Sequence, residues 1–183
     1  MSLAKVARFI TLPNIMEPSF KSDRSPMLKW IDIRKELPWL GRESIYFVNE
    51  AAERVLIEEL SKLGFHIAVM DGSNINDEEA FFSEVSSVLT FPKYFGRNWD
   101  AFADCFGDLQ YRSEKRRAII WKQASASLRA NPYMFIKATH ELLNAATDLG
   151  RCDPAKNEPV QIEVFFLGEE PAFTKRPSKC ANA

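Results

Sequence analysis

Three aspartates stand at every fourth position of one short segment of the chain: Asp100, Asp104 and Asp108. On a helix this spacing stacks the carboxylates on one face, where like charges destabilise the helix by roughly 0.2–0.5 kcal/mol per pair. The helix macrodipole favours a carboxylate in the first turn, which accounts for Asp100 alone. No Lys or Arg lies between residues 99 and 109 to neutralise the other two. The pattern is typical of a solvated helix face, and it is also what a surface that binds a basic partner or a metal ion requires.

The neighbouring residues predict the helix that carries these aspartates. Pro92 and Gly96 indicate a turn, in which we expect Gly96 to adopt a positive φ. Asn98 is a favoured N-cap, so the helix is predicted to begin near Trp99. We expect Cys105 to be a buried, unreactive thiol on its flank. Five apolar residues at helical spacing predict a stripe that faces a core: Trp99, Phe102, Ala103, Phe106 and Leu109.

An enzyme is the weakest of the possible functions. The three aspartates could hold Mg²⁺, which prefers carboxylate ligands, but they are spread along one helix with no substrate pocket indicated. Neither His66, in a predicted strand, nor His140, in a predicted helix, has a Ser or Cys nearby in the sequence with which to form a nucleophile pair. We therefore predict no catalytic residue, no metal ion and no cofactor.

Composition and charge limit the remaining classes. The 183 residues suit one well-buried domain with appendages, and a net charge of -1 argues against general nucleic-acid or membrane binding. No apolar run approaches the roughly 20 residues of a membrane span, and the N-terminus does not read as a signal peptide. Three widely spaced cysteines predict no disulfide framework, so the expected compartment is the cytoplasm. Residues 71–109, however, contain eight acidic and two basic residues, a local net charge of -6.

The order of predicted elements indicates an α/β fold. Strands are predicted over residues 44–48, 65–70, 117–122 and 160–167. Helices are predicted from Asn49 to Gly64, from Asn76 to just before Pro92, from Trp99 onward, and from Pro132 or Tyr133 to Gly150, with a loop or short turn over 126–131. The last helix is expected to pack inward through Phe135, Ile136, Thr139, Leu142, Leu143 and Ala146. Short strand–helix–strand connections predict a small parallel sheet of about four strands with helices packed on its faces.

Two segments flank this domain, which is predicted over residues 44–170. Residues 1–43 contain four prolines and no sustained period, so they are predicted to form an irregular arm. The arm is too apolar for a free tail, and we expect it to lie across the domain. Residues 171–183 are predicted to be a polar tail.

The segment that contains the aspartates also carries a longer motif. Residues 91–106 read Phe-Pro-Lys-Tyr-Phe-Gly-Arg-Asn-Trp-Asp-Ala-Phe-Ala-Asp-Cys-Phe. They match a proline, a tyrosine, Gly-x-Asn-x-Asp-Ala and a second aspartate followed by cysteine, the pattern of the barstar family of ribonuclease inhibitors. The resemblance extends in element order over residues 65–168. It implies the barstar-like three-layer fold and a protein whose acidic helix and preceding loop block the cationic active site of a ribonuclease.

This resemblance also implies where a partner would bind. The partner-binding residues are expected to be Tyr94, Gly96, Asn98, Asp100, Asp104, Asp108 and Leu142. The implied partner is a barnase-like ribonuclease of extracellular or toxin type, with no direct nucleic-acid or membrane contact. Five residues depart from the family pattern: Arg97, Ala103, Asp108, Leu109 and Ala145. Because they make the recognition surface smaller and less negative, a basic partner other than barnase is an open alternative.

A second hypothesis assigns the binding to the N-terminal extension. The chain would then keep the barstar fold without inhibiting a ribonuclease, and Trp30, Trp39 and Leu40 would form an exposed patch for another protein. Burial of these side chains against the domain's own sheet would instead favour a covering role.

Overall fold

The computed structural model describes residues 28–41, 45–151, 159–169, 171 and 173. Its four strands are all parallel and lie in the order β1-β4-β3-β2. Their bounds are β1 (Tyr46–Asn49), β2 (His66–Asp71), β3 (Arg116–Lys122) and β4 (Gln161–Gly168). The prediction of a small parallel sheet of about four strands is therefore confirmed.

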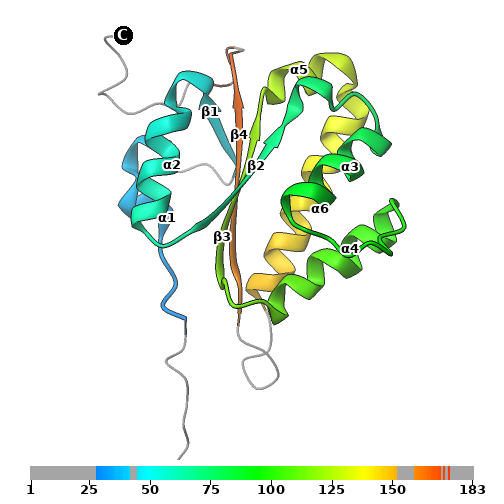
Figure 1. The fold of residues 1–183 in the computed structure, drawn as a ribbon. Helices are drawn as coiled ribbons and strands as arrows, with labels where there is room; N and C mark the ends of the chain where they lie inside the picture. The colour runs from blue at the N-terminus through cyan, green and yellow to red at the C-terminus, as the bar shows by residue number, and fades with distance from the viewer. Residues whose placement is uncertain (1–27, 42–44, 152–158, 170, 172, 174–183) are drawn as a thin grey trace, which may run out of the picture.

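Helices cover both faces of the sheet and make three layers (Figure 1). One face carries α3 (Glu78–Val88), α4 (Trp99–Gly107), α5 (Ala124–Ala130) and α6 (Pro132–Gly150), and the other carries α1 (Ile33–Glu36) and α2 (Glu53–Lys62). Short 3-10 turns complete the chain at η1 (Pro38–Leu40), η2 (Glu50–Ala52), η3 (Gly72–Asn74) and η4 (Asp108–Tyr111). Ile119 and Trp121 of β3 belong to one core, and Ala118 and Ile120 belong to the other. A strand that is buried on both faces has no polar side to alternate with, which explains its continuous apolar run.

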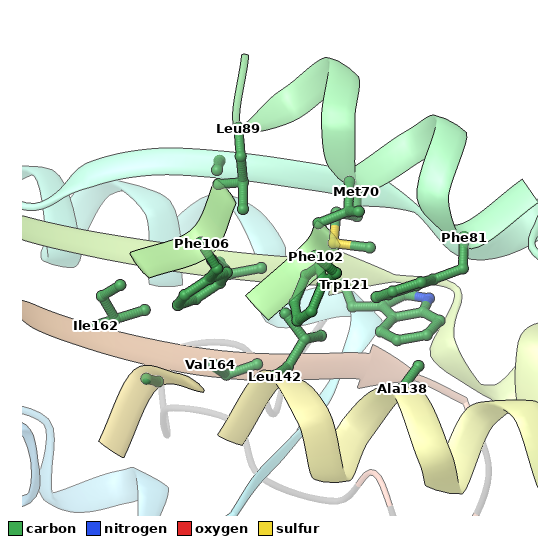
Figure 2. Close-up of a cluster of buried hydrophobic side chains, with 14 of the residues drawn as sticks. Met70, Phe81, Leu89, Phe102, Phe106, Trp121, Ala138, Leu142, Ile162 and Val164 are labelled. Carbon is green, nitrogen blue, oxygen red and sulfur yellow. The ribbon is translucent and has the colours of Figure 1, made fainter. Parts of the chain in front are cut away.

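The core on the α4 side is organised around Trp121, which is fully buried. Its ring stacks on Phe81 with 5.7 Å between centroids and meets Phe135 edge-on at 5.2 Å. Phe102 of α4 and Leu142 of α6 lie in the same cluster (Figure 2). Because α4 contributes to this shared core, its orientation on the sheet is set by packing.

A buried hydrogen-bond chain holds the carboxyl end of β2 in place. The indole Nε1 of Trp121 donates to Ser127 Oγ at 3.3 Å, and Ser127 Oγ donates to the carbonyl oxygen of Gly72 at 2.8 Å. A Cβ at Gly72 would lie only 2.5 Å from the carbonyl oxygen of Lys122. This close approach of two backbone segments requires glycine at position 72.

The described part of the N-terminal arm, residues 28–41, covers the second face of the sheet. Ile33, Leu37 and Leu40 are buried in the core beneath α2. The buried amide of Gln161 ties the arm down: its Oε1 accepts from the backbone N–H of Ile31 at 3.0 Å, and its Nε2 donates to the carbonyl oxygen of Ile31 at 2.7 Å. Of the three side chains that could have formed an exposed patch, Leu40 is buried, Trp39 is partly buried and Trp30 is 49% exposed, so the second hypothesis loses one of its three residues.

Three local expectations were wrong, and the described part of the arm, which was predicted to be irregular, contains two short helical segments, α1 and η1. Asp77 rather than Asn76 caps α3, since its Oδ1 accepts from the N–H of Ala80 at 2.8 Å. Residues 124–130 form the helix α5, where a loop was expected over 126–131. In α6 the side chain of Ile136 is 64% exposed, and Met134 and Ala138 take the inward positions.

The Glu163 carboxyl of β4 should make the stability of the protein depend on pH. Burial raises its pKa above the ordinary value, against the hydrogen bond from Gln161 Nε2 and the attraction of Arg34, while Asp32 raises it further. The folded protein therefore holds this proton more tightly than the unfolded chain does. The corresponding stabilisation is complete below the ordinary pKa and is lost as the pH rises through the folded pKa.

We expect Glu163→Gln to remove the free-energy cost of ionising this buried carboxyl at neutral pH, because glutamine keeps an acceptor for Gln161 and carries no charge. Calorimetry across pH should show a higher Tm than that of the wild type at neutral pH and an equal Tm in acid. A lower Tm at neutral pH would show that the charged form is the stabilising one.

Candidate functional site

The loop before α4 is held rigid by two aromatic anchors. The ring centroids of Phe91 and Phe95 are 5.2 Å apart, and both side chains lie against the core on the α4 side of the sheet. A turn in which the N–H of Phe95 donates to the carbonyl oxygen of Pro92 at 2.9 Å closes the loop. Between the anchors, Lys93 and Tyr94 point outward, and Tyr94 is 80% exposed. An exposed tyrosine on a fixed loop is well suited to anchor a partner protein.

Asn98 begins α4 as predicted. Its Oδ1 accepts from the N–H of Ala101 at 2.9 Å, and its Nδ2 donates to the carbonyl oxygen of Gly96 at 3.2 Å. The positive φ expected at Gly96 is wrong: the left-handed residue is Arg97, with φ 47°. A Cβ at Gly96 would lie 3.1 Å from Asn98 Nδ2, so glycine makes room for the capping side chain.

The inner face of α4 differs by one position from the predicted stripe. Phe102, Phe106 and Leu109 are buried as expected, and Trp99 packs beside Phe82 at 4.8 Å between ring centroids. Ala103 is exposed, so its inclusion in the stripe was wrong.

Cys105 takes the inward place instead and is buried, as expected. Burial raises the pKa of this thiol, and the nearby carboxylates of Asp108 and Asp104 raise it further. The thiol therefore stays protonated near neutral pH and is a poor nucleophile.

The outer face of α4 carries the aspartates. Asp100 and Asp104 lie on the helix itself, and Asp108 is its C-cap and the first residue of η4; all three are exposed. Within the described part of the chain, none of them forms an ion pair. The carboxylates are therefore available to an outside cation. Among the described residues no group of three or more His, Cys, Asp and Glu side chains is arranged to hold a metal ion.

Comparison with known families agrees with this geometry. Residues 65–166, more than half of the chain, match the family model described as barstar, the barnase inhibitor. The chain belongs to the barstar family. This is a family of inhibitors rather than enzymes. A comparison with curated proteins finds no match, and no helix in the described ranges is long and apolar enough to cross a membrane.

The barstar motif occupies the loop and helix just described. Five of the expected binding residues are exposed on this loop and helix: Tyr94, Gly96, Asn98, Asp100 and Asp104. We call the exposed residues from Lys93 to Asp104 the α4 face. Asp108 lies where this face ends. Two residues of the set have structural roles, because Asn98 caps α4 and Gly96 accommodates that cap.

Leu142 does not belong to this binding surface. Its side chain has no solvent exposure and lies in the core near Phe102 (Figure 2). Its expected role as a partner contact was therefore wrong. The helical phase of α6 is set by six inward residues, Met134, Phe135, Ala138, Leu142, Ala146 and Leu149, and this phase turns Leu142 toward the sheet.

The structure adds charged neighbours that the sequence pattern did not reveal. Lys137 of α6 lies 4.8 Å from the centroid of the Trp99 ring, and its Nζ is 3.0 Å from Glu78 Oε1. The Trp99 indole N–H, followed by the Lys137 ammonium, holds the pKa of Glu78 below its ordinary value. Next to them, Arg97 Nη1 lies 3.3 Å from Glu79 Oε1. Glu78 and Glu79 lie in the first turn of α3, and their pairing depends on how α3, α4 and α6 pack.

Proposed function

We propose that this protein inhibits a barnase-type ribonuclease by placing the α4 face in the cationic active site of the enzyme. The observation that carries the proposal is the pair of exposed carboxylates at Asp100 and Asp104, which no cation of the described chain neutralises. The two residues are one helical turn apart, about 6 Å along the axis.

The chemistry of a ribonuclease explains why carboxylates would suit this role. An enzyme that cleaves a phosphodiester presents Arg, Lys or His side chains to the phosphate and to the charge that develops in the transition state. Carboxylates form strong, charge-assisted hydrogen bonds with the same groups. The inhibitor would thus occupy the positions of the substrate phosphates, and Tyr94 would pack on the surface beside them. The negative field of residues 71–109 would also speed the encounter with a basic enzyme.

Two of the residues that depart from the family pattern reduce the contact area of this surface and leave both of its aspartates in place. Ala103 is exposed between the two aspartates and presents only a methyl group. Leu109 is buried in the core and adds no contact area. The contact area of α4 is therefore small, which favours a partner that binds chiefly through charge. We also propose that the protein acts in the cytoplasm, where the thiol of Cys105 stays reduced.

A capture experiment tests the proposal. The wild-type protein and an Asp104→Lys variant are immobilised separately and exposed to an extract of the source cells. Ribonuclease activity retained on each support is then measured by cleavage of a fluorescent RNA. The wild type should retain activity and the variant should not, and the released nuclease should be inhibited at a one-to-one ratio on titration with the free protein. No retained activity, or equal retention on both supports, would contradict the proposal.

A further inference from the structure

The charges of the α4 face are segregated along it. Lys93 and Arg97 precede the helix, whereas Asp100, Asp104 and Asp108 follow in that order toward its C-terminal end. The helix macrodipole points the same way, with its positive end at Asn98 and its negative end near Gly107. The face therefore has a basic end at Lys93 and Arg97 and an acidic end at Asp104 and Asp108, with Asp100 in the first turn between them.

The two cations of the basic end, Lys93 and Arg97, are accessible to a partner. Lys93 is exposed and has no ion pair with any described residue. Arg97 is paired with Glu79, but the two side chains are 55% and 80% exposed, and surface pairs of this kind contribute little to stability. Arg97 can therefore exchange Glu79 for another carboxylate at little cost.

Lys137 differs from these two cations because it belongs to the structure. Its ammonium is bonded to Glu78 and lies over the Trp99 ring, with its side chain only 32% exposed. Glu78 thus neutralises Lys137, which packs on Trp99 of α4. The charges of Lys93 and Arg97 are therefore accessible to a partner, whereas the charge of Lys137 on α6 is held by Glu78.

We propose that the partner surface is dipolar: a basic cleft faces Asp100, Asp104 and Asp108, and at least one carboxylate faces Lys93 and Arg97. The inference rests on the proposed function and narrows the partner to a protein with both features. Arg97 would leave Glu79 and form a two-pronged pair with the partner's carboxylate, a geometry that guanidinium groups favour. Opposite charges at the two ends would fix the orientation in which the partner docks.

For a uniformly basic partner, mutation of Lys93 and Arg97 would change the affinity in the opposite direction. Such a partner would be repelled by Lys93 and Arg97, so reversing these charges would tighten the complex. A dipolar partner would lose attraction and gain repulsion at the same two positions. The direction of the change, rather than its size, separates the two kinds of partner.

The test uses the ribonuclease activity retained on the immobilised wild type, purified and flowed over three forms of the full chain. These are the wild type, Lys93→Glu with Arg97→Glu, and a control with Arg54→Glu and Lys62→Glu. The control changes the net charge equally on α2, where both residues are exposed on the opposite side of the sheet. We expect the α4-face variant to bind at least tenfold more weakly and to associate more slowly, and the control to change affinity by less than about threefold. Circular dichroism confirms that each form is folded.

A fourth form, Glu79→Gln, gives an independent reading, because it releases Arg97 without touching the basic end itself. A dipolar partner should bind it as tightly as the wild type or more tightly. Weaker binding of Glu79→Gln, or equal or tighter binding of the reversed variant, would overturn the dipolar partner while leaving the inhibitor proposal standing. If the wild type retains no ribonuclease, the proposed function fails first and this inference fails with it.

Discussion

Replacing Asp104 with alanine is expected to weaken binding of the partner ribonuclease by roughly 10- to 100-fold, because a hydrogen bond to a charged group contributes about 1.5–3 kcal/mol. The same change should not destabilise the fold. Asp104 is exposed, pairs with no described cation, and lies in the C-terminal half of α4, where the macrodipole disfavours a carboxylate. Its removal also relieves repulsion from Asp100 and Asp108. Tm should therefore stay the same or rise, while calorimetric titration shows the lost affinity.

A glutamate on the far layer supplies the control for this experiment. Glu58 is exposed on α2, and Glu58→Ala changes the net charge by the same amount away from the α4 face. It should leave affinity almost unchanged. Unchanged affinity in Asp104→Ala as well would remove the main support for an acidic inhibitor helix. A fall in Tm on removing Asp104 would instead show that the carboxylate stabilises the fold.

Deleting residues 1–43 is expected to yield an insoluble or unfolded protein. The deletion removes Ile33, Leu37 and Leu40, each of which is buried against the second face of the sheet. Burying one such side chain stabilises a protein by about 1.5–3 kcal/mol, so the three together approach the whole stability of a typical domain, about 5–15 kcal/mol. The uncovered surface would be a large apolar patch, which promotes aggregation. The soluble fraction on expression and the Tm of any soluble product measure the outcome.

Point variants distinguish a lost cover from a general effect of truncation. Gln161→Leu leaves the backbone N–H and C=O of Ile31 without their side-chain partners, and it should lower the stability by about 1–3 kcal/mol. Substitution of Trp30, which is 49% exposed, should have a much smaller effect. A truncated protein that stays soluble at the wild-type Tm and loses a partner would revive the hypothesis of an N-terminal binding patch.

Much of the fold and part of the site could be predicted from the sequence, because these features depend on neighbours within a few residues. The apolar runs of β3 and β4 predicted buried parallel strands, and Asn98 with Phe102 and Phe106 predicted both the start of α4 and its inner face. The outward position of Asp100 and Asp104 follows from the same helical spacing.

Other features could not be predicted locally, because they arise where segments far apart in the sequence meet. The phase of α6 depends on its fit against β4 and α4, so Leu142 faces inward and Ile136 outward, although both are apolar. Next to the N-cap, the left-handed residue is Arg97 and not Gly96, and the side chain of Asn98 reaches back to the carbonyl oxygen of Gly96.

The amino-acid sequence by itself determined the family, the order of strands and helices, and the aspartates at every fourth position along and just after α4. Only the tertiary structure decided which acids the neighbouring cations pair with, and it left the aspartates of α4 without an ion pair to any described residue. Lys137 meets Glu78, and Arg97 meets Glu79, across gaps of 59 and 18 residues. Helical periodicity fixes the direction of a side chain on its own element, whereas its electrostatic neighbours depend on how the elements pack together.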